Sequence, residues 1–306
     1  MDAMNSLLGG NALLALGAAL LWGSSDFTGG MGVKGAGGGL RAALQVVLLS
    51  HASSFVVLLA IAYLRGDAIQ HCALLGWGLA AGVAGGGALT AFYIALSRGS
   101  MGASAAVSGL LAATIPAALT LWQQGSPGVY PLLGFAVAGM AIWLIAASPA
   151  SEDGAKHEAA RGAARQTIAL AMLAGLGFGS YFVALKMASP AGLILPMVSA
   201  RIGSLTVCSL MFLFLRPRAS KAGEARVEFS GQVAGWALGT ALLDAAGSVL
   251  FVAATRAGRL DVAAVLASLY PASTILLAAV ALGEWPTRRQ ALGMAAAVAA
   301  VALIAM

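Results

Sequence analysis

Apolar segments recur along the chain, separated by short stretches that hold glycine, proline and charged residues. About 20 consecutive apolar residues form a helix long enough to cross the hydrocarbon core of a bilayer. The pattern therefore predicts ten transmembrane helices, at residues 8–31, 40–63, 72–97, 103–123, 128–147, 167–188, 191–215, 230–256, 259–281 and 287–306. The one long polar stretch, residues 148–166, falls near the middle of the chain and is predicted to be a surface linker.

The composition narrows the class of protein. Hydrophobic residues make up 60% of the 306 residues and charged residues only 9%, against about a quarter in ordinary soluble domains. This excludes a soluble enzyme, a secreted disulfide scaffold and a nucleic-acid-binding protein, and it predicts an integral membrane protein. The net charge of +6 does not indicate a nucleic-acid partner, because most Lys and Arg residues lie in short loops beside apolar spans.

Glycine is abundant, with 40 residues, and small residues let membrane helices pack closely. Glycines four residues apart predict close helix crossings at three places: Gly78, Gly82 and Gly86; Gly175 and Gly179; and Gly235 and Gly239.

The two halves of the chain repeat each other. One constant shift along the sequence lays Gly76-Trp77 on Gly235-Trp236, Phe92 on Phe251 and Leu144-Ile145-Ala146 on Leu303-Ile304-Ala305. In the earlier spans a slightly shorter shift lays Gly23-Ser24 on Gly179-Ser180. Each unit holds five spans, so the second unit enters the membrane with the opposite orientation. This predicts an all-α inverted repeat, with a first five-helix unit (1–147), a linker (148–166) and a second five-helix unit (167–306).

The sequence also resembles a known family, most clearly in its second half. The stretch from Leu269-Tyr270-Pro271 through Leu282-Gly283-Glu284 to Leu292-Gly293 is similar to the C-terminal signature of the EamA-like family in the drug/metabolite transporter superfamily. The run Leu21-Trp22-Gly23-Ser24-Ser25 and Arg201 also fit that family's pattern. The first half departs from it at Gln45, Ala112 and Gly125, which stand opposite Arg201, Pro271 and Glu284.

The resemblance implies a ten-helix exporter or permease in the bacterial cytoplasmic (inner) membrane, for solutes such as amino acids, nucleosides or sugars. It implies both termini inside the cell, whereas the distribution of Lys and Arg over the loops favours both termini outside. The orientation stays open at this stage.

Polar and aromatic side chains inside the predicted spans are the candidate site residues, because polar groups are costly in a bilayer and rings can stack on a solute. The predicted substrate-binding residues are Trp22, Ser24, Gln45, Tyr93, Tyr181, Arg201 and Tyr270, with Arg201 expected to attract an anionic group of the solute. The predicted proton-coupling residues are Asp26, His51 and Asp244. Structural alternatives are packing roles for the rings, an ion pair of Asp26 with Arg41, and a neutral, hydrogen-bonded His51.

Arg201 and Asp244 are predicted to meet. Arg201 lies as far before the end of its span at 215 as Asp244 lies after the start of its span at 230. Equal separations from the shared loop, on antiparallel neighbours, place the two residues at equal depth. Each charge would be costly if it were unpaired, so we expect a salt bridge, or one intervening water, beside a central cavity.

These observations predict a secondary transporter of small polar or amphipathic metabolites that works by alternating access. We expect no cofactor and no metal site, protons as a possible coupling ion, and a monomer or a homodimer. One alternative is a passive channel for small solutes. A remote one is an intramembrane aspartyl protease built on Asp26 and Asp244, although Asp244 lacks the Gly-x-Gly-Asp setting that such enzymes resemble.

Overall fold

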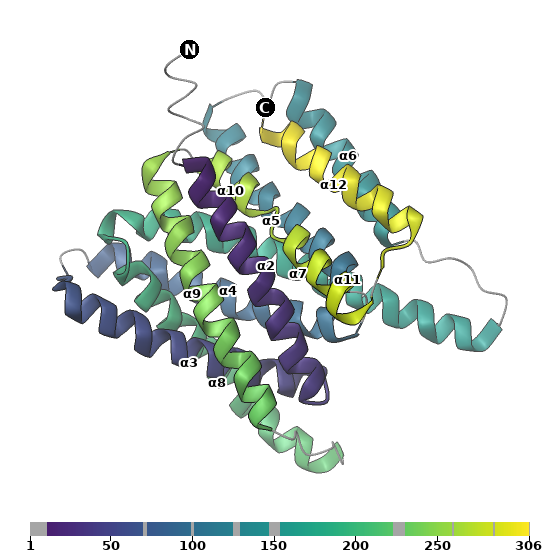
Figure 1. The fold of residues 1–306 in the computed structure, drawn as a ribbon, viewed down its shortest axis with the longest axis horizontal. Coiled ribbons are helices and arrows are strands. Elements are labelled where there is room, and N and C mark those ends of the chain that lie inside the picture. Colours follow the sequence, from purple (N-terminus) through teal and green to yellow (C-terminus); the bar gives the residue numbers. More distant parts are fainter. Residues whose placement is uncertain are drawn as a thin grey trace.

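The computed structural model describes residues 11–69, 72–98, 101–124, 129–146, 154–222, 230–258, 260–283 and 285–305 (Figure 1). Within these ranges every regular element is a helix, as predicted. Gly125, Glu284 and residues 148–153 of the predicted linker lie outside the described residues.

The helices of the first half follow the predicted spans closely. They are α2 (Asn11–Gly35), α3 (Gly39–Arg65), α4 (Cys72–Arg98), α5 (Met101–Gln124) and α6 (Val129–Ala146).

The helices of the second half differ from the prediction most at two places. They are α7 (Gly154–Ala188), the short 3₁₀ helix η1 (Ser189–Ala191), α8 (Leu195–Ala222), α9 (Gly231–Ala257), α10 (Leu260–Ala267), α11 (Pro271–Leu282) and α12 (Arg288–Ala305). First, α7 begins inside the predicted linker, because the alanine, glutamate, lysine and arginine that make up most of residues 155–165 are strong helix formers. Second, the predicted ninth span is divided into α10 and α11.

The division between α10 and α11 lies at residues 268–270. The backbone amides of Leu269 and Tyr270 donate to carbonyls three residues earlier, so the helix tightens before it ends. Pro271 then begins α11, where its missing amide hydrogen is not needed. Tyr270 itself keeps helical backbone angles (φ −48°, ψ −29°), and its side chain lines the cavity described below.

Six helical segments among the described residues are long and apolar enough to cross a membrane. They are Gly39–Arg65, Cys72–Arg98, Gly162–Ala191, Leu195–Phe214, Gly231–Ala257 and Ala263–Leu282. The last of these runs through the interruption between α10 and α11. The chain is therefore an integral membrane protein.

Helices of the two halves pack against each other in matched pairs. Helix α2 lies on α9 and α4 lies on α7; α3 contacts α9 and α8 contacts α4; α6 lies along α12 (Figure 1). The repeat makes α7, α8, α9 and α12 the counterparts of α2, α3, α4 and α6. When each helix is replaced by its counterpart, the α2–α9 contact becomes the α7–α4 contact and the α3–α9 contact becomes the α8–α4 contact. The α6–α12 contact is converted into itself.

Two of the three predicted glycine crossings are confirmed. Gly78, Gly82 and Gly86 lie directly on α8, where a Cβ atom at Gly82 would come 1.9 Å from the carbonyl oxygen of Ala200. Gly175 and Gly179 lie against α5 in the same way. The third prediction is wrong, because a Cβ atom at Gly235 or Gly239 would meet no described atom within 4 Å.

Candidate functional site

A cavity lies at the centre of the molecule, between helices of both halves. Its volume is about 50 Å³, which is room for a small group or a few water molecules and is well below the several hundred Å³ of a typical ligand pocket. Side chains from α2, α3, α4, α7, α8 and α9 and from the turn before α11 surround it: Trp22, Asp26, His51, Gly85, Leu89, Phe178, Tyr181, Phe182, Arg201, Asp244 and Tyr270.

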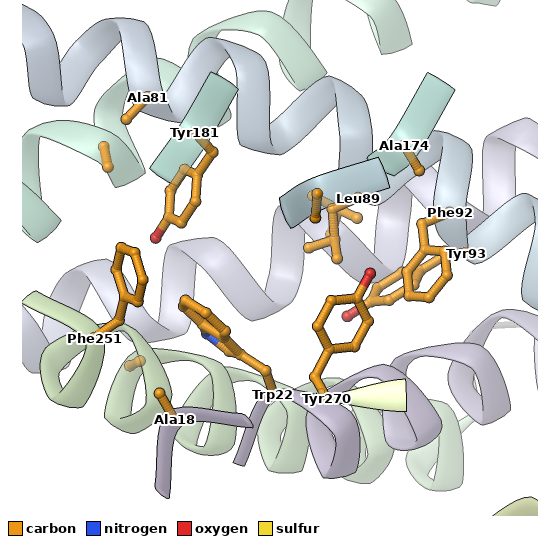
Figure 2. Close-up of a cluster of buried hydrophobic side chains, with 14 of the residues drawn as sticks. Ala18, Trp22, Ala81, Leu89, Phe92, Tyr93, Ala174, Tyr181, Phe251 and Tyr270 are labelled. Atoms are coloured by element: carbon orange, nitrogen blue, oxygen red, sulfur yellow. The ribbon is translucent and has the colours of Figure 1, made fainter. Parts of the chain in front are cut away.

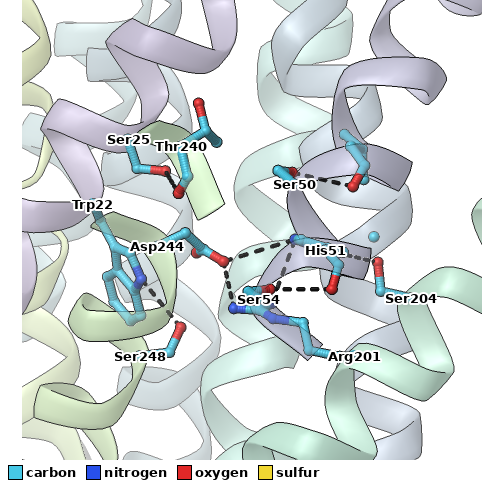
Figure 3. Close-up of polar contacts among 12 residues, drawn as sticks. Trp22, Ser25, Ser50, His51, Ser54, Arg201, Ser204, Thr240, Asp244 and Ser248 are labelled. Carbon is cyan, nitrogen blue, oxygen red and sulfur yellow. Dashed lines mark hydrogen bonds and ion pairs between the residues drawn. The ribbon is translucent and has the colours of Figure 1, made fainter. Parts of the chain in front are cut away.

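An ionic cluster joins three helices at one side of this cavity (Figure 3). Arg201 of α8 donates from Nη2 to Oδ2 of Asp244 on α9, and from Nη1 to Nε2 of His51 on α3, at 3.3 Å. Nε2 of His51 lies 3.7 Å from the same Asp244 oxygen. The predicted approach of Arg201 and Asp244 is thus confirmed, with His51 as a third member.

The hydrogen bonds around His51 fix its tautomer. A guanidinium group can only donate, so Nε2 of His51 accepts from Arg201 and carries no hydrogen. The hydrogen is therefore on Nδ1, which donates to Oγ of Ser204 at 2.5 Å. This network holds His51 in its neutral form, between two groups of α8.

Asp26 lines the cavity from α2 and is 6% exposed. Among the described residues the structure gives its carboxyl group neither an ion pair nor a hydrogen bond. The alternative ion pair with Arg41 is not formed, since the Arg41 guanidinium lies over the ring of Phe212 at 5.7 Å. Asp26 is therefore a buried carboxyl group that faces the cavity without a partner.

Aromatic rings form much of the cavity wall, and three of them, Trp22, Tyr181 and Tyr270, are labelled in Figure 2. Trp22 stacks on Phe182, with ring centroids 5.4 Å apart and planes inclined by 11°. Ser248 on α9 fixes two of these rings, because its hydroxyl accepts from Nε1 of Trp22 at 3.3 Å and lies 3.2 Å from the hydroxyl of Tyr181. The rings are thus held in place by hydrogen bonds as well as by packing.

Glycines allow close approach at two points near the cavity, one to a ring and one to the backbone of the turn. Gly85 on α4 lies so close to the ring of Tyr181 that a Cβ atom there would come within 2.9 Å of it. Gly23 on α2 lies against the turn before α11, where a Cβ atom would come 2.1 Å from the carbonyl oxygen of Tyr270. On the other side of this turn, the hydroxyl of Tyr270 is 2.5 Å from that of Ser108 on α5.

The structure brings most of the predicted site residues to this cavity. They are Trp22, Tyr181, Arg201 and Tyr270 among the predicted substrate-binding residues, and Asp26, His51 and Asp244 among the predicted proton-coupling residues. Three others are not in its lining. Ser24 donates to the carbonyl of Leu20, the Oε1 atom of Gln45 is buried without a partner, and Tyr93 is fully buried with its hydroxyl against Gly29.

Four lining residues were not among the predicted ones: Gly85, Leu89, Phe178 and Phe182. The internal repeat held a signal for three of them. The shift that aligns the early spans places Phe178 opposite Trp22 and Phe182 opposite Asp26, and the shift that aligns the later spans places Gly85 opposite Asp244. Since helices of both halves surround the cavity, the counterpart of a site residue is itself a candidate.

Comparisons with known proteins bear on the fold and on the family of the second half. This chain aligns with one crystal structure over 96% of this chain and 96% of the chain in that structure, with a TM-score of 0.64 and 16% sequence identity. This likeness shows the fold alone. A search of the curated proteins gave no match. Residues 165–306 match the model of the EamA-like transporter family, so the predicted resemblance is confirmed for the second half of this chain.

Proposed function

We propose that the protein is a secondary transporter, an exporter or permease of small polar or amphipathic metabolites, in the bacterial cytoplasmic (inner) membrane. The observation that carries the proposal is the central cavity, which is lined from both halves and holds an ionic cluster that ties α3 to α8 and α9. Charged groups buried in a membrane protein mark solute or ion pathways more often than they serve packing. The EamA-like match of the second half supports the same class of function.

The proposed mechanism is alternating access between two inverted five-helix units. The matched helix contacts support it, because exchanging the halves converts the α2–α9 contact into the α7–α4 contact. The interruption between α10 and α11 beside Tyr270 supports it as well, since discontinuous helices form the binding sites of many such transporters. Rocking of one unit against the other would expose the cavity to each side of the membrane in turn.

Protons are the proposed coupling ion, with Asp26, His51 and Asp244 as the candidate carriers. A proton on Asp244 would remove the charge that holds Arg201, and would leave the guanidinium bound to His51 alone. The link between α8 and α9 would then weaken, which frees these helices to move apart. Proton binding and helix movement are coupled in this way by a single ion pair.

Purified protein in proteoliposomes tests the proposal. A pH gradient should drive accumulation of a solute from a panel of amines, amino acids, nucleosides and sugars, and internal unlabelled solute should drive counterflow. Asp244→Asn should abolish proton-driven accumulation and spare counterflow, because the variant cannot exchange a proton. Asp67→Asn, which changes a carboxyl group paired with Arg65 after the end of α3, is the matched control and should behave as the unaltered protein.

Two results would contradict the proposal. Equilibration of a solute without accumulation or counterflow would indicate a passive channel. Unchanged proton-driven accumulation by Asp244→Asn would exclude this carboxylate as the coupling group.

A further inference from the structure

We infer that the charged group recognised by the cavity is a cation, an ammonium group carried by an amphipathic solute, and that Asp26 is its counter-ion. The inference rests on the proposed transport function and adds the chemical class of the solute. It reverses the expectation from the sequence, in which Arg201 attracts an anion.

The charge of Arg201 is already paired with a carboxylate. Each of its two terminal nitrogens donates once, to Asp244 and to His51, and its Nε atom is buried without a hydrogen-bond partner. An incoming carboxylate would have to displace Asp244, a carboxylate already bound to the same guanidinium. The interaction energy that this carboxylate gained with Arg201 would be no larger than the energy that Asp244 lost. It would also bring a second negative charge toward Asp26.

The balance of charge in the cavity favours a cation. Arg201 and Asp244 neutralise each other, and the hydrogen bonds of His51 hold it neutral. Asp26 is the remaining acidic group, and its ionised form needs a positive charge beside it. It is more than nine-tenths buried, it lines the cavity, and no described side chain compensates it. A buried carboxylate without a partner is costly, so a bound ammonium group would supply the missing positive charge.

The rings beside Asp26 suit the rest of such a solute. Trp22 lies one helical turn from Asp26 on α2, and residues four apart share a helix face. The π faces of Trp22, Tyr181 and Phe182 attract a cation and also bury an apolar body. A single carboxylate next to stacked rings thus fits an aromatic or aliphatic amine better than a sugar or a carboxylic acid.

Direct binding to the full chain in detergent tests this without any transport step. The probe is radiolabelled phenethylamine, and the competitors are 2-phenylethanol and 3-phenylpropionate, which keep the ring and replace the ammonium by a hydroxyl or a carboxylate. On the unaltered protein we expect phenethylamine to bind at least 10-fold more tightly than the alcohol, and 3-phenylpropionate to compete least. Asp26→Asn should weaken the amine at least 10-fold and leave the alcohol unchanged, whereas Asp67→Asn should change neither.

The outcomes separate this inference from the proposed function. Binding of the carboxylate as tightly as the amine, or no saturable binding of phenethylamine, tryptamine or hexylamine, overturns the inference even if transport of another solute is found. Amine binding that depends on Asp26 supports the inference even if no counterflow is seen. The absence of counterflow would contradict the proposed transport mechanism instead. If Asp26→Asn fails to fold, the ranking of the three ligands on the unaltered protein still decides.

Discussion

Replacing Gly82 by alanine should separate α4 from α8 and disturb the ionic cluster at the same time. The added methyl group would lie 1.9 Å from the carbonyl oxygen of Ala200 and 2.8 Å from the amide nitrogen of Ser204. Ordinary contact begins at 3.4 Å, so the two helices would have to move apart by about 1.5 Å in a core that is packed without voids. Both opposing atoms belong to the backbone, so no side chain can rotate away.

The expected cost follows from this geometry. Overpacking a core usually costs about 1–3 kcal/mol, and we expect about 3 kcal/mol here because only a movement of whole helices relieves the clash. Arg201 follows Ala200 directly, so the same movement draws its guanidinium away from Asp244. Gly82→Ala should therefore lose stability and solute binding together.

Gly87→Ala is the matched control on the same helix. A Cβ atom at Gly87 would meet no described atom within 4 Å, so this change should be neutral or stabilise the helix by about 0.5–1 kcal/mol. The free energy of unfolding is measured by SDS titration in mixed micelles, beside solute binding for each variant. If Gly82→Ala is as stable as Gly87→Ala, the close packing of α4 on α8 is refuted.

Two further predictions concern the cavity wall. Arg201→Gln and Asp244→Asn should each lower the free energy of unfolding by about 3 kcal/mol, because each leaves a buried charge unpaired. The double variant should regain at least half of the summed loss. Strictly additive losses in SDS unfolding would show that the pair is not coupled. Ser248→Ala should cost about 1–3 kcal/mol, because it removes the partner of the buried Trp22 and Tyr181 donors; a variant as stable as the unaltered protein would mean that cavity water replaces the hydroxyl.

The positions of the helices could be predicted from the sequence because the bilayer demands long apolar segments, and polar residues interrupt them at loops. The same pattern could not show where a long apolar segment is interrupted by its own backbone. At the turn, residues 268–270, the sequence holds no charged residue and no glycine, and only Pro271 indicated the division between α10 and α11. Likewise, the Gly235 and Gly239 spacing resembles a packing motif, yet the face they form meets no neighbour among the described residues.

Depth in the membrane was predictable for Arg201 and Asp244, because counting residues from a shared loop gives the height along each helix. The direction in which each side chain points around its helix axis was harder to predict. Ser24 lies two residues from both Trp22 and Asp26, and residues two apart do not share a helix face. It therefore points away from the cavity that its neighbours line.

The availability of each charge could not be predicted from the sequence. Arg201 and Asp26 were both intramembrane charges on different helices, and either one could have been free for a solute. Only the three-dimensional arrangement shows that Asp244 and His51 occupy Arg201, while Asp26 faces the cavity with no partner among the described residues. This distinction determines the sign of the solute that we propose.

Accessibility of the cavity from each side of the membrane tests the central proposal most directly. A cysteine is introduced by Leu89→Cys in a chain whose Cys72 and Cys208 are replaced by serine, with the buried position Val46→Cys as the control. A membrane-impermeant thiol reagent is applied to right-side-out and to inside-out vesicles. Alternating access predicts that Leu89→Cys reacts from both sides, that bound solute slows both reactions, that Val46→Cys does not react, and that the vesicles stay sealed to ions. Reaction from one side only, or reaction from both sides together with ion leakage, would contradict alternating access.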